Sequence, residues 1–392
     1  MKSQLVLFSL VSIVLSASIF QSFLKGFEQL NSISQEVLQQ DEETELIKLH
    51  RNLVEISSIS QNETSVSEFL ANYLKKQGLT VETQSIDDSG KRQNIYAYFG
   101  DSKDAKVLIS SHIDTVPPFI PYRREGDLIY GRGSVDAKGS VATQILSTLN
   151  LFQNGEIQNG DVALLFVVSE ELDGAGMKFV NEHLDANWDH AIFGEPTEGK
   201  LGVGHKGIYN FAIEVQGKAS HSGYPELGID ANTKLINILH KIIHSEYPTN
   251  ELLGNSTINP GIIDAGVASN VVSPIAKARV LIRVASDASK VVEIISNIIE
   301  EENQEYHNIN LIQSQYSEPA YLNFTVPGFE SIVLAYATDI PYLTRDFKSR
   351  YLYGPGTIHV AHSANEYLSI KDLENAVIGY ENLTKYLLHK QD

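Results

Sequence analysis

Short apolar runs alternate with helix-like segments along most of the chain. Residues 106–112, 161–171 and 190–196 are such runs, typical of strands that are covered on both faces of a sheet. Between the first two runs, residues 138–152 have the spacing of an amphipathic helix, which an Asn-Gly pair ends. This alternation predicts an α/β fold with a mostly parallel central sheet.

Each of these apolar runs ends on or beside a histidine or a carboxylate. His112 ends the first run, Glu170 and Glu171 end the second, and Glu195 follows the core of the third. In open α/β sheets, ligands bind in the crevice outside the carboxyl ends of the strands. We therefore expect these side chains to converge at one edge of the sheet.

A different pattern occupies residues 207–308. It has the order strand, helix, two strands, helix and the start of a last strand at Asn308, which matches a βαββαβ (ferredoxin-like) unit. The flanking residues 45–206 and 309–392 would then be the two parts of one catalytic domain. The chain ends in a predicted helix at 369–388, whose first residues "SIKD" indicate an N-cap.

The N-terminus has the layout of a secretory signal peptide. Residues 1–18 combine Lys2, an apolar run and small residues at its end. The run is shorter than the roughly 20 apolar residues of a membrane-spanning helix, so we expect cleavage and no stable membrane anchor. Residues 19–44 form a polar segment that could be a propeptide. We expect a secreted protein, with a vacuolar or lysosome-like lumen as the alternative.

Composition and charge narrow the partners of the protein. The chain has 49 acidic and 30 basic residues, a formal charge of −19, which disfavours nucleic acid and anionic membranes as partners. It has no cysteine, so any metal must be held by histidine and carboxylates. Asn-x-Thr sequons fit passage through a glycosylating compartment. They begin at Asn62, Asn255, Asn323 and Asn382.

The chain offers a set of metal ligands without sulfur. This set suits one or two zinc-like ions in a hydrolytic site. Asp114 lies two residues after His112 on an extended segment, so it could accept the ring N–H of His112. One carboxylate of the Glu170-Glu171 pair could bind metal while the other takes a proton from water. The candidate ligands are His112, Asp136, Glu170, Glu171, Glu195 and His362.

The His112-x-Asp114 triplet and the Glu170-Glu171 pair also have interpretations that involve no function. A lone His-x-Asp triplet is more often a surface ion pair, and an acidic pair is often part of a solvated loop. The Glu170-Glu171 pair, however, directly follows the strongly apolar "VALLFVV", which leaves the solvated loop and the functional site as equal alternatives.

Seven motifs in the chain resemble, in the same order, those of a known enzyme family. They are "SSHIDTVPP", "GRGSVDAKG", "SEELDG", "FGEPT", "HKG", "ASHSGYPELGIDAN" and "YGPGTIHVAHSANEYL". Together they resemble the dizinc metallopeptidases that include acetylornithine deacetylase, succinyl-diaminopimelate desuccinylase, aminoacylase and glutamate carboxypeptidase. The resemblance runs over residues 45–392. It implies a zinc-dependent exopeptidase-like catalytic domain and an inserted lid and dimerisation domain, through which a homodimer could form.

The resemblance also implies a role for each candidate ligand. His112, Asp136 and Glu195 would hold one zinc ion. Asp136, Glu171 and His362 would hold the other, so that Asp136 bridges the two. Glu170 would be the general base, Asp114 would support His112, and a cis peptide bond would follow Asp136.

Further residues would contact the substrate. By the same resemblance, His221 of the inserted unit would reach the reacting carbonyl. A second group would grip the free carboxylate of the substrate, a task that suits the bidentate geometry of arginine. That group is Arg283, Asn270, Gly354 and Gly356.

These roles predict a zinc-dependent hydrolase that cleaves an amide bond next to a free carboxylate. We expect a carboxypeptidase that acts on peptides, with an N-acyl-amino-acid deacylase as the close alternative. In the family, Glu at the position of Glu195 is associated with these two activities and argues against an aminopeptidase. A Ser220-His221 nucleophile pair is disfavoured, because adjacent strand residues point to opposite faces. A non-catalytic metal-binding ectodomain would have lost a ligand or the base, and none is missing.

The ligand set generates a first prediction. We expect about two zinc ions per fully loaded chain, since the histidines and carboxylates suffice for two sites with a shared ligand. Elemental analysis after zinc loading and dialysis checks this. No more than one tightly held ion would contradict the bridging role of Asp136.

Overall fold

The computed structural model describes residues 43–390 of the 392-residue chain. The expected signal peptide (1–18) and nearly all of the expected N-terminal segment (19–44) lie outside the described residues, and both stay predictions. The chain divides into two units, residues 1–49 and 50–392. Helix α2 (Glu45–Glu55) spans their border, and everything below concerns residues 50–392.

A six-stranded sheet organises the catalytic part of the chain. Its strand order is β1-β2-β6-β3-β7-β19. β6, β3, β7 and β19 run parallel, β2 pairs antiparallel with β6, and β1 pairs antiparallel with β2. β6 is buried along its whole length and β3 at all but one residue, as the apolar runs predict. The strands are β1 (Thr80–Ser85), β2 (Gln93–Tyr98), β3 (Ala105–His112), β6 (Val162–Val167), β7 (Trp188–Phe193) and β19 (Ser349–Leu352).

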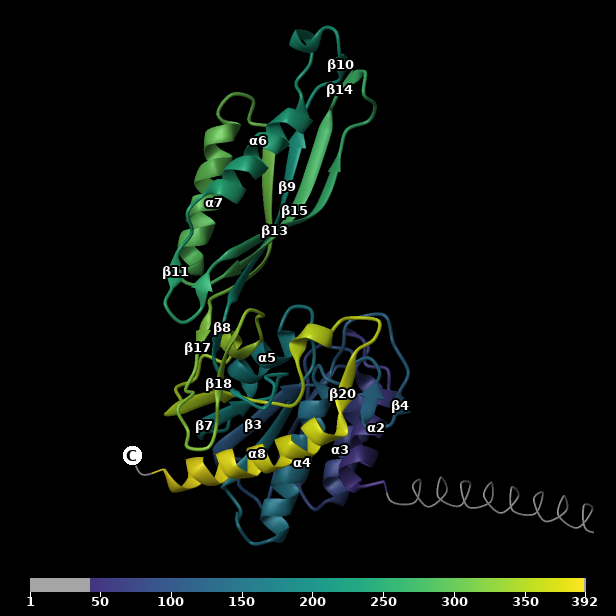
Figure 1. Cartoon of the computed structure of the whole chain (residues 1–392), viewed down its shortest axis with the longest axis vertical. Coiled ribbons are helices and arrows are strands. Elements are labelled where there is room, and N and C mark those ends of the chain that lie inside the picture. The colour runs from purple at the N-terminus through teal and green to yellow at the C-terminus, as the bar shows by residue number, and fades with distance from the viewer. Residues whose placement is uncertain (1–42, 391–392) are drawn as a thin grey trace, which may run out of the picture. The chain divides into compact units, whose positions relative to one another are not determined.

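Helices pack on this sheet. α4 contacts β3, β6 and α8, and Figure 1 shows α4 and α8 side by side. Because α8 covers the outer side of α4, α4 is buried nearly all round and is not amphipathic, unlike the helix that the sequence predicts. Ser369 caps α8 as expected, since its hydroxyl accepts a hydrogen bond from the Asp372 amide at 3.0 Å. The helices are α3 (Thr64–Lys76), α4 (Lys138–Gln153), α5 (Ala175–His183) and α8 (Ile370–His389).

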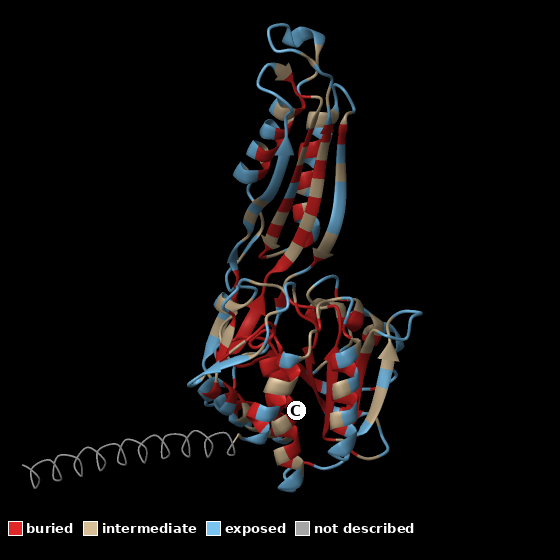
Figure 2. Cartoon of the chain, turned by 90° about the vertical axis from the view of Figure 1, so that its right-hand side faces the viewer, coloured by how far each residue is buried: buried red, intermediate tan, exposed pale blue. Residues whose placement is uncertain are grey.

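A separate antiparallel sheet forms the inserted unit. Its order, β13-β15-β9-β16, and the chain order β9-α6-β13-β15-α7-β16 confirm the predicted βαββαβ unit. Along β9 and β15 every second residue is buried, which Figure 2 shows as alternating colours, because one face packs on α6 and α7. The elements are β9 (Gly207–Gln216), α6 (Ala231–His244), β13 (Thr257–Ala265), β15 (Ile275–Val284), α7 (Ala288–Asn303) and β16 (Ile309–Ser317).

The two ends of the inserted unit lie side by side. β16 pairs with β9 up to Ser317 opposite Ile208, so this sheet continues beyond the expected end of the unit at residue 308. The segment after β16 then pairs with the one before β9, through Ala320 opposite His205. Gly207 permits this approach, because a Cβ atom there would lie 2.3 Å from the Ser317 carbonyl oxygen.

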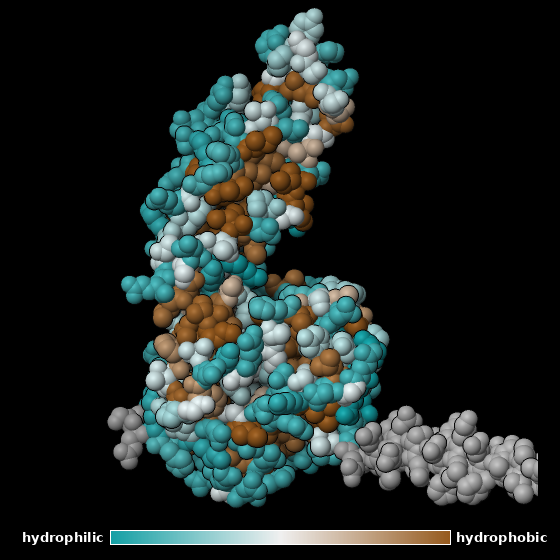
Figure 3. Space-filling view, in the orientation of Figure 1, coloured by the Kyte–Doolittle hydropathy of each residue, from teal (hydrophilic) through white to brown (hydrophobic). Residues whose placement is uncertain are grey.

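One edge of the inserted unit is apolar and exposed. β13 is an edge strand, and Ile262 and Ile263 on it are 57% and 58% exposed. Figure 3 shows apolar side chains gathered over this unit. Long apolar edge strands favour pairing with another chain. The homodimer that the family resemblance implies stays a prediction, with which this edge is consistent.

Short elements complete the described chain. Within residues 43–390, no helix has both the length and the apolar character needed to cross a membrane. All four sequon asparagines are exposed, and their glycosylation stays a prediction. The short strands are β4 (Arg123–Glu125), β5 (Leu128–Tyr130), β8 (Leu201–His205), β10 (Ser220–His221), β11 (Thr249–Asn250), β12 (Gly254–Asn255), β14 (Val271–Val272), β17 (Ala320–Tyr321), β18 (Ser331–Leu334) and β20 (Tyr367–Ser369). The 3-10 turns are η1 (Pro225–Leu227), η2 (Ile340–Tyr342) and η3 (Ile358–Val360).

Candidate metal centre

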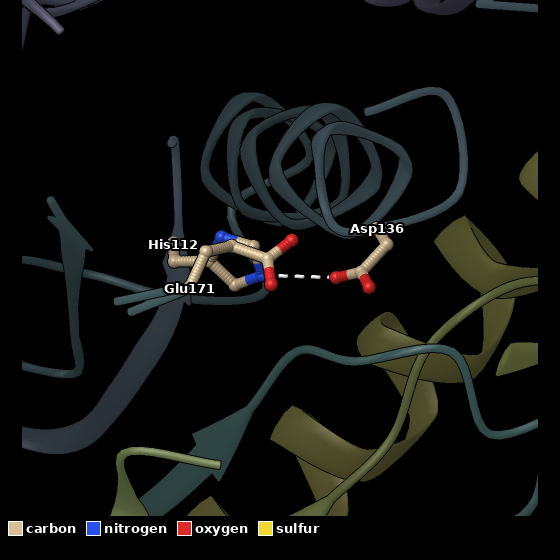
Figure 4. A group of neighbouring side chains, drawn as sticks. All are labelled: His112, Asp136 and Glu171. Carbon is tan, nitrogen blue, oxygen red and sulfur yellow. Dashed lines mark hydrogen bonds and ion pairs between the residues drawn. The ribbon is translucent and has the colours of Figure 1, made fainter. Parts of the chain in front are cut away.

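The carboxyl ends of the parallel strands bring the predicted ligands together. His112 is the last residue of β3, Glu171 follows β6, and Asp136 lies just before α4. Donor atoms of these three side chains lie within 4.8 Å of one another, and Figure 4 shows them facing a common point. Such a group of imidazole and carboxylate donors is able to hold a metal ion.

Asp136 lies between two histidines and turns one oxygen towards each. Its Oδ1 is 3.0 Å from His112 Nε2 and its Oδ2 is 3.2 Å from His362 Nε2. His112 Nε2 is also 3.6 Å from Glu195 Oε1, and His362 Nε2 is 3.1 Å from Glu171 Oε2. Ligands of one tetrahedral zinc ion, each at about 2.0–2.1 Å, lie roughly 3.3 Å apart. The observed spacings are of this size, so the group is able to hold metal, with one Asp136 oxygen facing each histidine.

The charges of this group depend on one another. Burial would raise the pKa of Asp136, but hydrogen bonds from His112 and His362 hold it well below its usual range. Burial opposes protonation of His112, yet the facing carboxylates, Glu195 first, raise its pKa well above the usual value. Hydrogen bonds to Asp136 and Glu171 raise the pKa of His362 to about 10. The carboxylates around His112 and His362 thus favour a positive charge on or next to the two imidazole rings.

The ionised forms of the remaining carboxylates, Glu170, Glu171 and Glu195, are destabilised in the absence of a cation. Burial, and after it the charge of Asp136, raises the pKa of Glu171 to about 7. Burial is also the largest cause that raises the pKa of Glu170 and of Glu195 well above the usual value, against the charge of His112. Several like charges in one buried place require compensation, which bound cations would provide.

Asp114 supports the centre in a different way from the one expected. His112 Nδ1 lies 3.0 Å from the backbone oxygen of Asp114 but 3.6 Å from its Oδ1, so the main chain accepts the ring N–H and leaves Nε2 towards the ligands. The Asp114 carboxylate instead accepts hydrogen bonds from the amides of Glu170 (3.0 Å) and Glu171 (3.2 Å) and from the Ser60 hydroxyl (2.7 Å). It thereby fixes the end of β6 beside the end of β3.

A buried ion pair that the sequence did not reveal joins two ligand segments. Arg132 Nη1 donates to Glu366 Oε2 at 2.6 Å, and both side chains are almost fully buried. Glu366 Oε1 accepts from the amides of Val135 (3.2 Å) and Asp136 (3.4 Å), while Arg132 Nη2 donates to the His362 carbonyl at 3.4 Å. Both residues lie inside the quoted motifs "GRGSVDAKG" and "ANEYL", but only the fold shows that they pair.

The peptide bond between Asp136 and Ala137 is cis, as the resemblance implies. His362 has a φ of 62°, in the left-handed region that a non-glycine residue adopts at a cost. Such conformations cluster at functional sites, where the surrounding structure over-determines them.

A cavity of about 300 Å³ opens beside the ligands. Arg283 on β15 also lines it, and within the described residues its guanidinium has no hydrogen bond or ion pair. Burial lowers the pKa of Arg283, and the charge of Glu170 acts in the opposite direction. The other lining residues are Asp136, Glu170, Glu171, Leu172, Glu195, Ile208, Leu281, Gln315, Ser317, Tyr336, Ala337, Thr338, Asp339, Tyr342, Ile358, Ala361 and His362.

Four predicted substrate-contacting residues lie outside this cavity. His221 on β10 is exposed, and Asn270 beside it accepts a hydrogen bond from the Ser222 amide. Gly354 and Gly356 bind the chain after Glu195, because their carbonyl groups accept from the amides of residues 197 to 199. A Cβ atom on Gly354 would lie 2.4 Å from the Glu195 carbonyl oxygen. The two glycines thus position a ligand segment, and a substrate role for all four residues stays a prediction.

Comparison with known proteins decides the family. The model of peptidase family M20/M25/M40 matches residues 108–386. The chain belongs to this family. A peptidase M20 domain-containing protein of Schizosaccharomyces pombe is 49% identical over 88% of this chain and 85% of its own. A protein of Arthroderma otae named "Probable carboxypeptidase" is 40% identical over 89% of this chain and 87% of its own.

Solved structures of M20 peptidases show the same fold. A metallo-carboxypeptidase of Sulfolobus solfataricus superposes with a TM-score of 0.71 at 18% identity, over 88% of this chain and 99% of its own. The resemblance and the α/β class with a separate antiparallel unit are therefore confirmed. The part of this M20 chain that matches the family includes all the candidate metal ligands and Glu170.

The buried ion pair of this M20 peptidase generates a second prediction. Glu366→Gln leaves Arg132 buried without its counter-charge, so we expect a loss of about 3–5 kcal/mol of stability and weaker zinc retention. Thermal unfolding and competition with a chelator measure the two effects. Glu374→Gln on the exposed side of α8 is the matched control, expected within about 0.5 kcal/mol of the parent. If Glu366→Gln unfolds and binds zinc as the parent does, the ion pair does not hold the two ligand segments in place.

Proposed function

We propose that this M20 chain is a zinc-dependent carboxypeptidase that removes the C-terminal residue of peptides. The observation that carries the proposal is Arg283. It places an uncompensated guanidinium in the same cavity as the metal centre, which is what recognition of a carboxylate beside the scissile bond requires. The 40% identity to a fungal protein named as a probable carboxypeptidase supports the choice.

The residues divide the chemistry among themselves. His112, Asp136 and Glu195 would hold one zinc ion, and Asp136, Glu171 and His362 the other. When bound, zinc supplies Lewis-acid chemistry that polarises an amide carbonyl and eases the deprotonation of water. The cavity beside the ligands is where the scissile amide would lie.

Glu170 fits the role of general base. Its carboxyl group lines the cavity, and burial and neighbouring carboxylates raise its pKa, so it accepts a proton more readily than an ordinary glutamate does. The hydrogen bond from its amide to Asp114 fixes its backbone. Glu170 would take a proton from water as the water oxygen bonds to the carbonyl carbon. It would then deliver that proton to the amine nitrogen as the C–N bond breaks, which returns Glu170 to its ionised form.

Arg283 would orient the substrate. Two parallel hydrogen bonds to a terminal carboxylate would hold the adjacent amide bond in the cavity that Arg283 and Glu170 both line. An N-acyl amino acid presents the same carboxylate, so an N-acyl-amino-acid deacylase is the alternative that the geometry leaves open.

A substrate panel tests the proposed activity. The zinc-loaded protein is offered dipeptides, N-acyl amino acids and amino-acid amides, and the products are identified. We expect release of C-terminal amino acids from peptides and no cleavage when the carboxylate is amidated. Faster cleavage of simple N-acyl amino acids would favour the deacylase, and cleavage of the amides would contradict both.

Arg283→Gln extends this test to the residue that carries the proposal. We expect its kcat/KM on peptides to fall roughly 10²-fold, mainly through KM, because a buried charge-assisted contact is lost. The matched control is Arg279→Gln, an exposed arginine on the same strand, which should keep parent activity. Equal kinetics for the two variants would exclude carboxylate recognition by Arg283.

A further prediction separates base from ligand in the Glu170-Glu171 pair. Glu170→Gln removes the proton acceptor at nearly constant shape, so zinc should stay bound while turnover falls by roughly 10²–10⁴-fold or more. Glu171→Gln removes a charged ligand, so metal content should fall along with activity. Zinc stoichiometry after dialysis and turnover on one good substrate measure both. Loss of zinc from Glu170→Gln with retention in Glu171→Gln would reverse the assignment.

A further inference from the structure

A further carboxyl group lines the cavity, and the proposed mechanism does not use it. Asp339 lies at the start of η2 and is only 7% exposed. Its Oδ2 atom is buried and has no hydrogen-bond partner, and its side chain does not cap η2. Asp339 is not a member of the group of donors that could hold a metal ion in the described part of the chain. A buried carboxylate with an unsatisfied oxygen is costly unless a cation or a donor reaches it.

The segment that carries Asp339 is held in place on both sides. The Thr338 hydroxyl donates to His205 Nε2 at 2.9 Å and accepts from the Ile340 amide at 3.1 Å, while Tyr336 donates to the Pro196 carbonyl at 3.2 Å. These bonds hold the backbone that carries Asp339 in the cavity wall. A group on a held backbone recognises a ligand at lower entropic cost than one on a flexible segment.

Glu170 interacts electrostatically with both unpaired charges of the cavity. Asp339 opposes the ionisation of Glu170, and Glu170 favours the charged form of Arg283. Arg283 comes from β15 of the inserted unit, whereas Asp339 comes from the wall of the catalytic part at η2. The cavity is thus lined by a basic group, an acidic group and the base Glu170.

We propose that Asp339 binds an ammonium group on the acyl side of the scissile amide, so that the enzyme prefers substrates with a positive charge there. This inference rests on the proposed function, because Arg283 then takes the carboxylate of the departing residue. A dipeptide spans roughly 7 Å at 3.3–3.6 Å per residue, which suits a cavity of about 300 Å³. The ammonium group could be the free α-amino group of a dipeptide or the side chain of lysine.

Three substrates test the inference in the unaltered zinc-loaded enzyme. They are Ala-Phe, N-acetyl-Ala-Phe and N-acetyl-Lys-Phe, and release of phenylalanine is measured. We expect kcat/KM to be at least about tenfold higher for Ala-Phe than for N-acetyl-Ala-Phe if the α-amino group is bound. A comparable advantage of N-acetyl-Lys-Phe over N-acetyl-Ala-Phe identifies the lysine side chain instead. Three equal rates would overturn the inference.

Variants connect the preference to Asp339. Asp339→Asn removes the charge, and we expect the ratio between charged and uncharged substrates to fall towards one. Asp339→Glu retains the carboxylate and should retain a preference of the same sign. Asp346→Asn, on the exposed chain after η2, is the control and should keep the parent ratio.

Other outcomes would overturn the inference in distinguishable ways. Loss of zinc from Asp339→Asn on dialysis would show that Asp339 compensates the metal charge and not a substrate. An unchanged ratio with full zinc would show that another group selects the substrate. If none of the three substrates releases phenylalanine, the proposed function fails and the inference fails with it, whereas equal release from all three overturns the inference alone.

Discussion

The structure depends on the close approach of like charges at the carboxyl ends of β3, β6 and β7. Asp136 faces a histidine with each of its oxygens, and Glu171 and Glu195 lie on either side of that arrangement. Such a cluster is stable only if cations balance it and if the protein prevents the carboxylates from moving apart. The parallel sheet supplies the proximity, and hydrogen bonds that Asp114 and Glu366 accept from backbone amides supply the restraint.

The cavity beside this cluster is lined by a basic group on one element and an acidic group on another. Arg283 brings a positive charge from the inserted unit, and Asp339 brings a negative charge from the catalytic part. Neither has a hydrogen-bonded counter-charge of its own within the described chain, so a substrate with the opposite pair of charges would satisfy both. Substrate selection and catalysis would then use one set of electrostatic interactions, because Glu170 is a neighbour of both groups.

The sequence predicted those parts of the site that follow from local pattern. Apolar runs that end in His112 or Glu170 show both a strand and its functional end, and parallel topology brings such ends together. Pairing across the chain was not predictable, because Arg132 and Glu366 are 234 positions apart and each looks like a surface charge by itself. Asp339 stands in "ATDIPY", which matches no motif, so only its burial in the cavity wall reveals it. The helix expected at 138–152 is present, but it is not amphipathic as predicted. The reason is that α8, which covers its outer side, is far away in sequence.

The entry and exit of the inserted unit have a consequence for how such a protein could change over time. Ile208 and Ser317 are partners in one sheet, and His205 and Ala320 are partners in the other, so the two connections form a continuous two-stranded ribbon. Within the described chain, the strands that lead to the ligands (β3, β6 and β7) belong to a different sheet from the strands of the inserted unit. As far as the pairing of the described strands is concerned, the inserted unit is joined to the catalytic part only through these two paired connections. Lineages could therefore lengthen, trim or exchange it as a module, and acquire new specificity while the catalytic strands stay unchanged.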